Sequence, residues 1–229
     1  MKKKSNFSQY NNIIRASIMG ANDGIISIAG IVVGVAGATT NMGTILLAGL
    51  AGTLAGTVSM AMGEYVSVSS QRDSQKKIVE DQTKALKEDF QKEFDAVYQN
   101  YRDMGISEPL ALKATNEMMN KDALGTTVRE RFGFTLGQEL DARAAAIASM
   151  LSFPAGALLP MLAISCAPTA LKEGLTFITV VIALALTGYG AASFNGADKK
   201  HAALRNIISG ILTMVVTYVV GMIFRGEGF

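Results

Sequence analysis

The sequence lacks most of what a soluble enzyme or a disulfide-stabilised fold requires. Its 229 residues include one cysteine (Cys166), one histidine (His201), four prolines and no tryptophan. A single thiol cannot close an intrachain disulfide, and one thiol with one imidazole falls short of a zinc site. Because no nucleophile–base pair, zinc motif or phosphate loop is present, we expect no enzyme. A net charge of +2 without a long basic patch argues against nucleic acid as a partner.

Charge is also scarce over most of the chain. Residues 71–141 carry 25 of the 40 charged residues, and the other 158 positions carry only 15. The overall composition, 49% hydrophobic and 17% charged, is therefore the average of a very polar insert and a very apolar remainder. This division excludes both a single soluble globule and a bundle that lies wholly inside a membrane.

Five segments are long and apolar enough to cross a membrane as helices, which takes about 20 residues. They are 13–38, 44–68, 144–164, 175–194 and 206–224. If all five were buried in a soluble core, too little chain would remain to cover them. We therefore predict an all-α membrane protein with five transmembrane helices and a cytosolic helical insert between spans two and three. The predicted segments are 1–70 with the first two spans, 71–141 as the insert, and 142–229 with the last three.

Basic residues flank the spans unevenly, which predicts the orientation in the membrane. The turn between spans one and two carries no charge, and Lys172 between spans three and four is balanced by Glu173. The remaining basic flanks are Lys2, Lys3, Lys4, Arg15, Lys199, Lys200 and Arg205. We expect the N-terminus and insert in the cytoplasm and the C-terminus outside, as in a bacterial inner (plasma) membrane. The first apolar segment is too long for a signal peptide and has no clear cleavage site, so we expect it to be retained.

The insert has the pattern of a small helical domain. Apolar residues from Ile78 to Tyr101 form one stripe, which predicts a single helix that ends at Gly105. Ser107 is the expected N-cap of a second helix. The inner face of that second helix is predicted to carry Leu110, Ala114 and Met118. A third short helix is expected at 123–132, before Gly133.

Asp23 is the most informative residue of the spans. It lies ten residues beyond Ile13, so it sits about 15 Å deep, near the bilayer midplane. A carboxylate there costs about 2.5–3.5 kcal/mol on insertion scales, and such residues usually line an ion or proton pathway. The alternative is a protonated aspartate that is hydrogen-bonded between helices. The neighbouring Asn22 and Gly24, which supply an amide and room for close approach, favour the pathway.

Span two offers partners for Asp23. Met60 and Glu64 are four residues apart and share a helix face, with Glu64 at the inner interface and Met60 one turn deeper. A carboxylate with a thioether suits Fe²⁺ or Mn²⁺ better than Ca²⁺ or Mg²⁺. For Met60, the alternative is packing against lipid or core.

Glycines and insert acids complete the set of candidates. Both spans are rich in glycines at four-residue steps, which predict close helix packing and are compatible with a dimer. These glycines include Gly20, Gly24, Gly30, Gly34, Gly52 and Gly56. Acidic rows in the insert could hold divalent cations at Glu80, Asp81, Glu88, Glu93 and Glu130. The alternative is a solvated, salt-bridged surface, because 11 lysines and arginines are interleaved.

Two strings of the sequence carry a family resemblance. GANDGIISIAGIVVGVAGA in span one and AGLAGTLAGTVSMAMGEYVSVSSQRD in span two are similar to the vacuolar iron transporter family, in its bacterial and nodulin-like form. The order of two spans, insert and three spans agrees with it over nearly the whole chain. The resemblance implies a homodimer that exports cytosolic Fe²⁺, and often Mn²⁺, in exchange for protons. It implies no prosthetic group, because the metal ion is the cargo.

The resemblance also assigns residues. It places the pathway aspartate at Asp23 and the pathway methionine at Met60, between spans one and two at the dimer interface. A glutamate of the plant members falls on Gly52 here, and Glu64 supplies a cytosolic-side carboxylate instead. In the insert, Glu93 alone is in register with the family's metal ligands. The other expected ligand positions hold Gln82, Ala85, Ala96, Thr127 and Arg131, with Glu80, Asp81, Glu88 and Glu130 close enough to substitute.

Two other functions fit parts of the sequence. A membrane-tethered metal buffer or sensor would use the insert as its working part. A proton-coupled transporter of another cation would keep Asp23 as a proton relay. An organic cation would need an aromatic-lined cavity, and the spans have few aromatic residues. A divalent-metal/proton antiporter is therefore the leading hypothesis.

Overall fold

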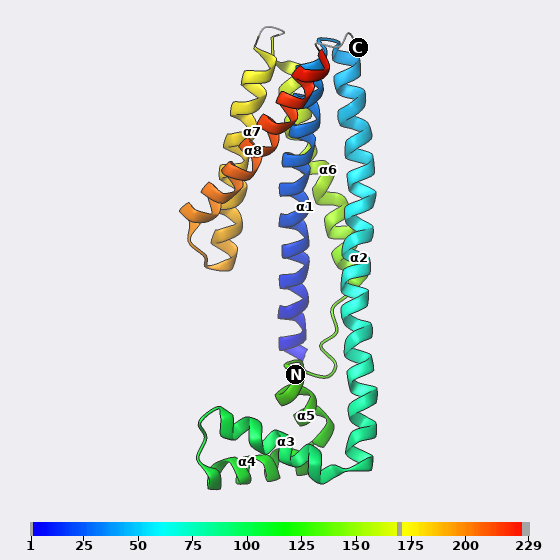
Figure 1. Ribbon diagram of the computed structural model, residues 1–229, viewed down its shortest axis with the longest axis vertical. Helices are drawn as coiled ribbons and strands as arrows, with labels where there is room; N and C mark the ends of the chain where they lie inside the picture. The colour runs from blue at the N-terminus through cyan, green and yellow to red at the C-terminus, as the bar shows by residue number, and fades with distance from the viewer. Residues whose placement is uncertain (1, 169–170, 226–229) are drawn as a thin grey trace. The chain divides into compact units, whose positions relative to one another are not determined.

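The computed structural model describes residues 2–168 and 171–225, and the regular structure in these residues is helical throughout (Figure 1). Its helices are α1 (Lys2–Ala38), α2 (Met42–Glu88), α3 (Phe90–Asp103), α4 (Glu108–Lys121), α5 (Ala123–Phe132), α6 (Ala142–Cys166), α7 (Lys172–Asn195) and α8 (Lys199–Arg225). Five of them, α1, α2, α6, α7 and α8, are long and apolar enough to cross a membrane. The predicted all-helical class with five candidate spans is confirmed.

The helices belong to two compact units. One unit comprises Met1–Tyr10 and Ser67–Asp141, and the other comprises Asn11–Val66 and Ala142–Phe229. The long helices α1 and α2 each contribute residues to both units. Of the predicted segments, residues 1, 169–170 and 226–229 lie outside the described residues, as do the side chains of Lys2, Lys3 and Lys4.

Helix α1 forms the centre of the apolar unit. Half of the residues in its most apolar stretch are buried, compared with 17% in the corresponding stretches of α2 and α8. Ile28 and Val32 of α1 are fully covered and share one core with Phe153 of α6, Leu184 of α7 and Met214 of α8. Since a solvent- or lipid-facing helix buries one stripe only, α1 is the helix against which the others pack.

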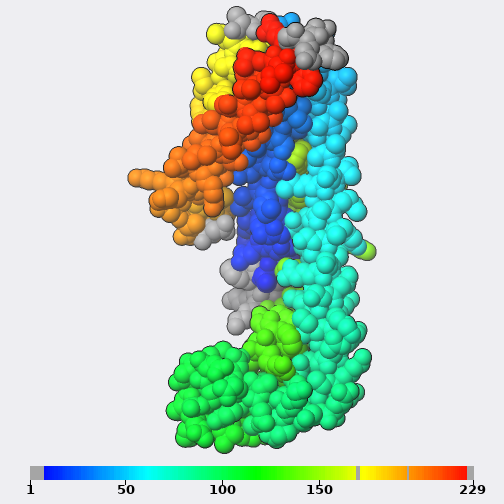
Figure 2. Space-filling model, viewed as in Figure 1, coloured from blue at the N-terminus to red at the C-terminus, as the bar shows by residue number. Residues whose placement is uncertain are grey.

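Helix α2 keeps a long apolar face uncovered. Leu47, Leu54, Val58 and Met62 are each more than half exposed, and α2 (cyan) lies open at the surface in Figure 2. Apolar side chains in this position are suited to lipid or to another protein chain.

The glycines predicted from their spacing lie where helices approach closely. An added Cβ at Gly20 or Gly24 would collide with α6, and one at Gly30 or Gly34 would press on α8. At Gly52 it would meet α1, and at Gly56 the ring of Phe153 in α6. All of these contacts lie within one chain, so they explain the glycine pattern without a second copy.

Helices α7 and α8 form an antiparallel hairpin (Figure 1). The Asp198 carboxylate caps α8 by accepting from the backbone N–H of Lys200 at 2.9 Å and of His201 at 3.1 Å. The His201 ring, together with these backbone bonds, lowers the pKa of Asp198. At the other end of the spans, the buried Lys172 ammonium lies 3.5 Å from the carbonyl of Thr40 and connects α7 to the α1–α2 turn.

The polar unit differs from prediction at the start of its first helix. The stripe from Ile78 to Tyr101 is not one helix, because α2 ends at Glu88 and α3 begins at Phe90. Asp89 causes the break, since its side chain accepts from the Lys92 backbone N–H at 2.9 Å and so caps α3. Downstream, Gly105 and Gly133 have φ of 85° and 74°, and they lie where helices were predicted to end.

The second helix of this unit has a shifted inner face. Ala111, Thr115 and Met119 of α4 are buried, whereas the predicted Leu110 is 59% exposed. The small side chains of Ala111 and Thr115 let α4 approach α3, where Val97 and Tyr101 complete the core. Size at the contact, rather than hydrophobicity, sets the rotation of this helix.

Candidate functional site

Asp23 lies on the exposed side of α1. Its Oδ1 accepts a hydrogen bond of 2.7 Å from the Ser27 hydroxyl, one turn further along the helix. Asp23 is uncovered in a single chain, although its neighbour Gly24 is buried against α6. A carboxylate with one hydroxyl partner is far from satisfied, because it has about four acceptor positions. The geometry leaves Asp23 open to a cation, to a proton or to groups from another chain.

Glu64 is held by an arginine. Its side chain is only 11% exposed, and it forms an ion pair with the guanidinium of Arg15, which is 47% exposed. Arg15 also donates to Asn12 Oδ1 at 3.0 Å and lies 3.1 Å from the sulfur of Met19. The carboxylate that was predicted to meet metal at the inner interface is thus paired with a cation from α1.

The pairing of α1 with α2 places Met60 between the two acids. Arg15 lies beside Glu64, and Val32 lies beside Gly49, so the two helices are antiparallel. Four residues of helix advance about 6 Å, so Met60 lies one turn deeper than Glu64. In this register, the turn of α2 that precedes Met60 lies level with Asp23 of α1. The three predicted residues form a sequence of depths, although the contacts of Met60 are with the apolar core.

Met19 is a candidate that the sequence pattern did not identify. Arg15, Met19, Asp23 and Ser27 recur every fourth residue, so they follow one side of α1. Met19 is 47% exposed, one turn before Asp23 and in contact with Arg15. Its thioether therefore adds a second soft donor beside the carboxylate. The four-residue spacing from Asp23 was the available signal for it.

Glu93 in the polar unit has its own cation. It is 5% exposed. Its carboxylate accepts from the side chain of Gln82 on α2 and from the guanidinium of Arg131 on α5. The family resemblance implied metal ligands at positions 82, 93 and 131. In this chain, Gln82 and Arg131 both donate to Glu93. The charge of Glu93 is balanced without a metal ion.

The other acids proposed for the insert lie on its surface or pair with basic residues. Asp81 pairs with Lys77 at 2.8 Å and raises the pKa of that lysine, and Glu130 pairs with Arg129 at 2.7 Å. Glu88 is exposed at the end of α2. Among the described residues, no three His, Cys, Asp or Glu side chains are grouped to hold a metal ion. Burial, together with Glu130, raises the pKa of Tyr101.

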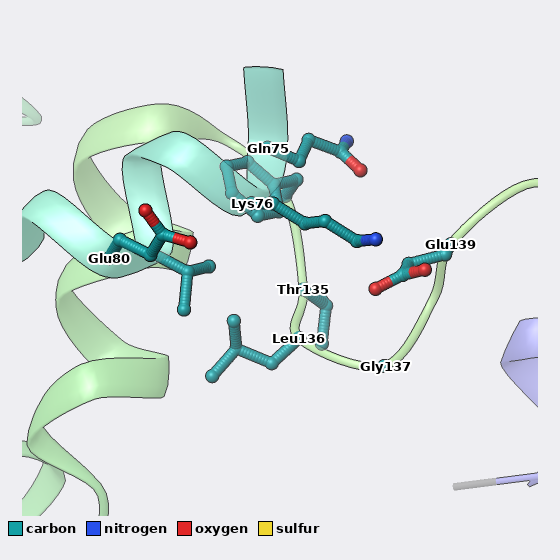
Figure 3. Close-up of a pocket in the computed structure, with 9 residues that line it drawn as sticks. Gln75, Lys76, Glu80, Thr135, Leu136, Gly137 and Glu139 are labelled. Carbon is teal, nitrogen blue, oxygen red and sulfur yellow. The ribbon is translucent and has the colours of Figure 1, made fainter. Parts of the chain in front are cut away.

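Glu80 lines a pocket of about 280 Å³ in the polar unit. Figure 3 shows its carboxylate on one side, and on the other the Lys76 ammonium directed toward Glu139. Thr135 and Leu136, from the loop after α5, form the wall between them. A lysine in the same pocket, directed toward Glu139, disfavours a bound cation, because it already supplies a positive charge.

Comparison with known proteins places this geometry in context. Residues 14–222 match the VIT family. The chain is 31% identical over 212 residues to a vacuolar iron transporter of Acanthamoeba castellanii, covering 92% of this chain and 78% of that protein. It is 34% identical over 218 residues to vacuolar iron transporter homolog 1 of Oryza sativa subsp. japonica, covering 94% and 75%. Vacuolar iron transporter homolog 3 of Arabidopsis thaliana is 28% identical over 218 residues, covering 95% and 86%.

Proposed function

This chain belongs to the VIT family, and we propose that it carries divalent iron across a membrane. The resemblance predicted from spans one and two is thereby confirmed. We extend the proposal to Mn²⁺ as a second cargo, to export from the cytosol, and to exchange for protons. The observation that carries it is Asp23, an acid deep in a membrane helix whose only hydrogen bond given by the structure comes from the Ser27 hydroxyl.

In the proposed pathway, the ion meets Glu64, passes the thioethers of Met60 and Met19, and binds at Asp23. Carboxylate and thioether together suit Fe²⁺ and Mn²⁺ better than harder cations. A proton from the far side competes with the metal for the Asp23 oxygens, so protonation releases the ion. This coupling requires only that one group accept either a proton or the metal at a time.

A second copy of the chain would complete the site. Asp23 and the apolar face of α2 are uncovered in one protomer. A lipid-facing carboxylate at the midplane is costly, whereas a carboxylate between two protomers can share a cation with its partner. The proposed homodimer therefore brings the two Asp23 side chains toward one interface, with the insert in the cytoplasm of a plasma-membrane protein.

The insert supports transport without a dedicated metal site. Its many exposed carboxylates, among them Glu80, Asp81 and Glu88, raise the local concentration of cations by long-range attraction. Glu93 is occupied by Arg131 and is a structural residue in this proposal.

The proposal is tested by flux in proteoliposomes that contain the purified chain. With Fe²⁺ outside and an imposed pH gradient, Asp23→Asn should lower the initial rate at least tenfold, because the amide cannot alternate between a proton and a metal. Glu117→Gln makes the same chemical change on the exposed face of α4 and should transport normally. If Asp23→Asn reaches the membrane folded and transports at the unmodified rate, the pathway is wrong.

A further inference from the structure

A polar cavity lies beside the proposed pathway and shares Arg15 and Met19 with it. It measures about 250 Å³ and is enclosed by α1, α7 and the first turns of α8. Its polar lining comes from Arg15, Asn22, Arg205 and Asn206.

The charge of this cavity is entirely positive. Arg15 and Arg205 line it, and no carboxylate does. Glu64 balances Arg15. Arg205 has no ion pair or hydrogen bond within the described part of the chain, and it is exposed. The two guanidinium groups therefore share a single negative charge, that of Glu64, at a membrane boundary. The unbalanced positive charge makes the cavity a site for an anion.

The walls of the cavity are held in place by specific contacts. The Thr187 hydroxyl donates to Asn22 Oδ1 at 2.8 Å, which ties α7 to α1 and leaves the Asn22 amide N–H groups as donors. At Gly188 the hairpin is so close that an added Cβ would lie 2.8 Å from the Ala202 carbonyl and 3.0 Å from the Asn206 amide. The cavity is therefore held in shape by these contacts, with donors from Arg15, Asn22, Arg205 and Asn206 beside apolar residues such as Ile18 and Ala191.

We propose that this cavity binds a phosphate group, foremost the headgroup of an anionic phospholipid. Guanidinium groups match phosphate oxygens with two parallel hydrogen bonds, and amides add further donors. Basic pockets between membrane helices bind such headgroups at the boundary of the bilayer. The cavity extends along α1 from Arg15 to Asn22, about 10 Å at 1.5 Å per residue. We place the phosphate at its Arg15 end, which is the end of the first span that the basic residues mark as the membrane boundary. Ile18, Ala191 and Ala202 supply apolar lining that suits the start of the acyl chains.

Native mass spectrometry of the purified full chain tests this site without metal. The protein is taken from vesicles of phosphatidylcholine with phosphatidylglycerol, and retained lipid is counted. The unmodified chain should retain phosphatidylglycerol at least fivefold over phosphatidylcholine, and Arg205→Gln should remove that preference. Lys200→Gln is the matched control, because it removes a cation from the first turn of the same helix, outside the cavity lining.

A second arm separates lipid from free anion. Inorganic phosphate is added to the detergent-solubilised chain, and the melting temperature is followed. Protection of the unmodified chain but not of Arg205→Gln assigns the site to free phosphate, which retains the proposed chemistry. Equal phosphatidylglycerol retention by Arg205→Gln and the unmodified chain, or no preference for either anion, overturns the proposal. Since no metal is present, these outcomes are independent of transport.

Discussion

At the scale of single residues, the pairing of Arg15 with Glu64 has the largest consequence for transport. In the proposed pathway, an incoming metal ion would compete with the guanidinium of Arg15 for the Glu64 carboxylate. We expect Arg15→Gln to lower the apparent KM for Fe²⁺ about fivefold, since a partly exposed ion pair is worth about 1 kcal/mol. Initial flux over a range of Fe²⁺ concentrations measures it.

Arg225→Gln is the control for this prediction. It removes an arginine from the last turn of α8, which has no part in the Arg15–Glu64 pair, and should leave the KM for Fe²⁺ unchanged. A higher KM in Arg15→Gln would instead mean that Arg15 holds Glu64 in position for the metal.

Depth and spacing in the sequence were enough to select Asp23, Met60 and Glu64 as candidates. They could not reveal that Arg15, counted only as a marker of orientation, lies against Glu64, because 49 residues separate the two. That contact depends on how α1 and α2 align, which no local pattern encodes. The same holds for Glu93 and Arg131, which are 38 residues apart.

At the scale of helices, the packing of α1 on α6 depends on glycines without side chains. A Cβ at Gly24 would overlap the Phe153 carbonyl and lie 3.1 Å from the Ala157 nitrogen. These are backbone atoms and cannot move aside, so we expect Gly24→Ala to destabilise the spans by about 1–3 kcal/mol. Gly190→Ala in α7, where nothing lies within 4 Å, should be neutral or slightly stabilising. Thermal unfolding in detergent compares the two variants.

The ion pair of Glu93 joins three helices of the polar unit. Removing the guanidinium leaves a carboxylate that is 6% exposed with Gln82 as its only remaining partner. We expect Arg131→Ala to lower the free energy of unfolding of the insert by about 3 kcal/mol. Added Fe²⁺ should not raise the free energy of unfolding of the unmodified insert. Hydrogen exchange of α3 and α5 in the full chain measures both. Arg102→Ala removes a guanidinium of α3 that donates to the Ile106 carbonyl at 2.8 Å rather than to a buried carboxylate, so it should cost far less. Strong protection of α3 by Fe²⁺ would contradict a metal-free insert.

The helices show which parts of a fold the sequence can specify. Long apolar runs predicted the five spans, because membrane thickness fixes their length. Asp89 stayed unrecognised as a cap, because the apolar stripe continues past it from α2 into α3. The rotation of α4 was predicted one residue off, since Leu110 is the larger side chain but Ala111 is the one that fits against α3.

At the scale of the whole chain, the distribution of charge requires two environments. Outside the insert only five acids remain, and Asp23 and Glu64 are the two that lie within the spans predicted from the sequence. A third, Glu173, falls in the first turn of α7. The acids of 71–141 belong to the polar unit, and the membrane helices to the other. A transporter with this division gathers cations by its soluble surface and selects them by a few residues in the bilayer.

The single cysteine provides a test of the orientation. Cys166 is exposed at the end of α6, the helix that follows the insert, so the proposed topology puts the two on opposite sides of the membrane. With the insert in the cytoplasm, a membrane-impermeant maleimide should label Cys166 in intact spheroplasts. Lys121→Cys in a Cys166→Ser background places the thiol on α4, and it should react only after permeabilisation. The reverse pattern would put the insert outside, and Glu64 would then lie at the exit of the pathway, where its pairing with Arg15 would oppose release rather than entrance of the metal.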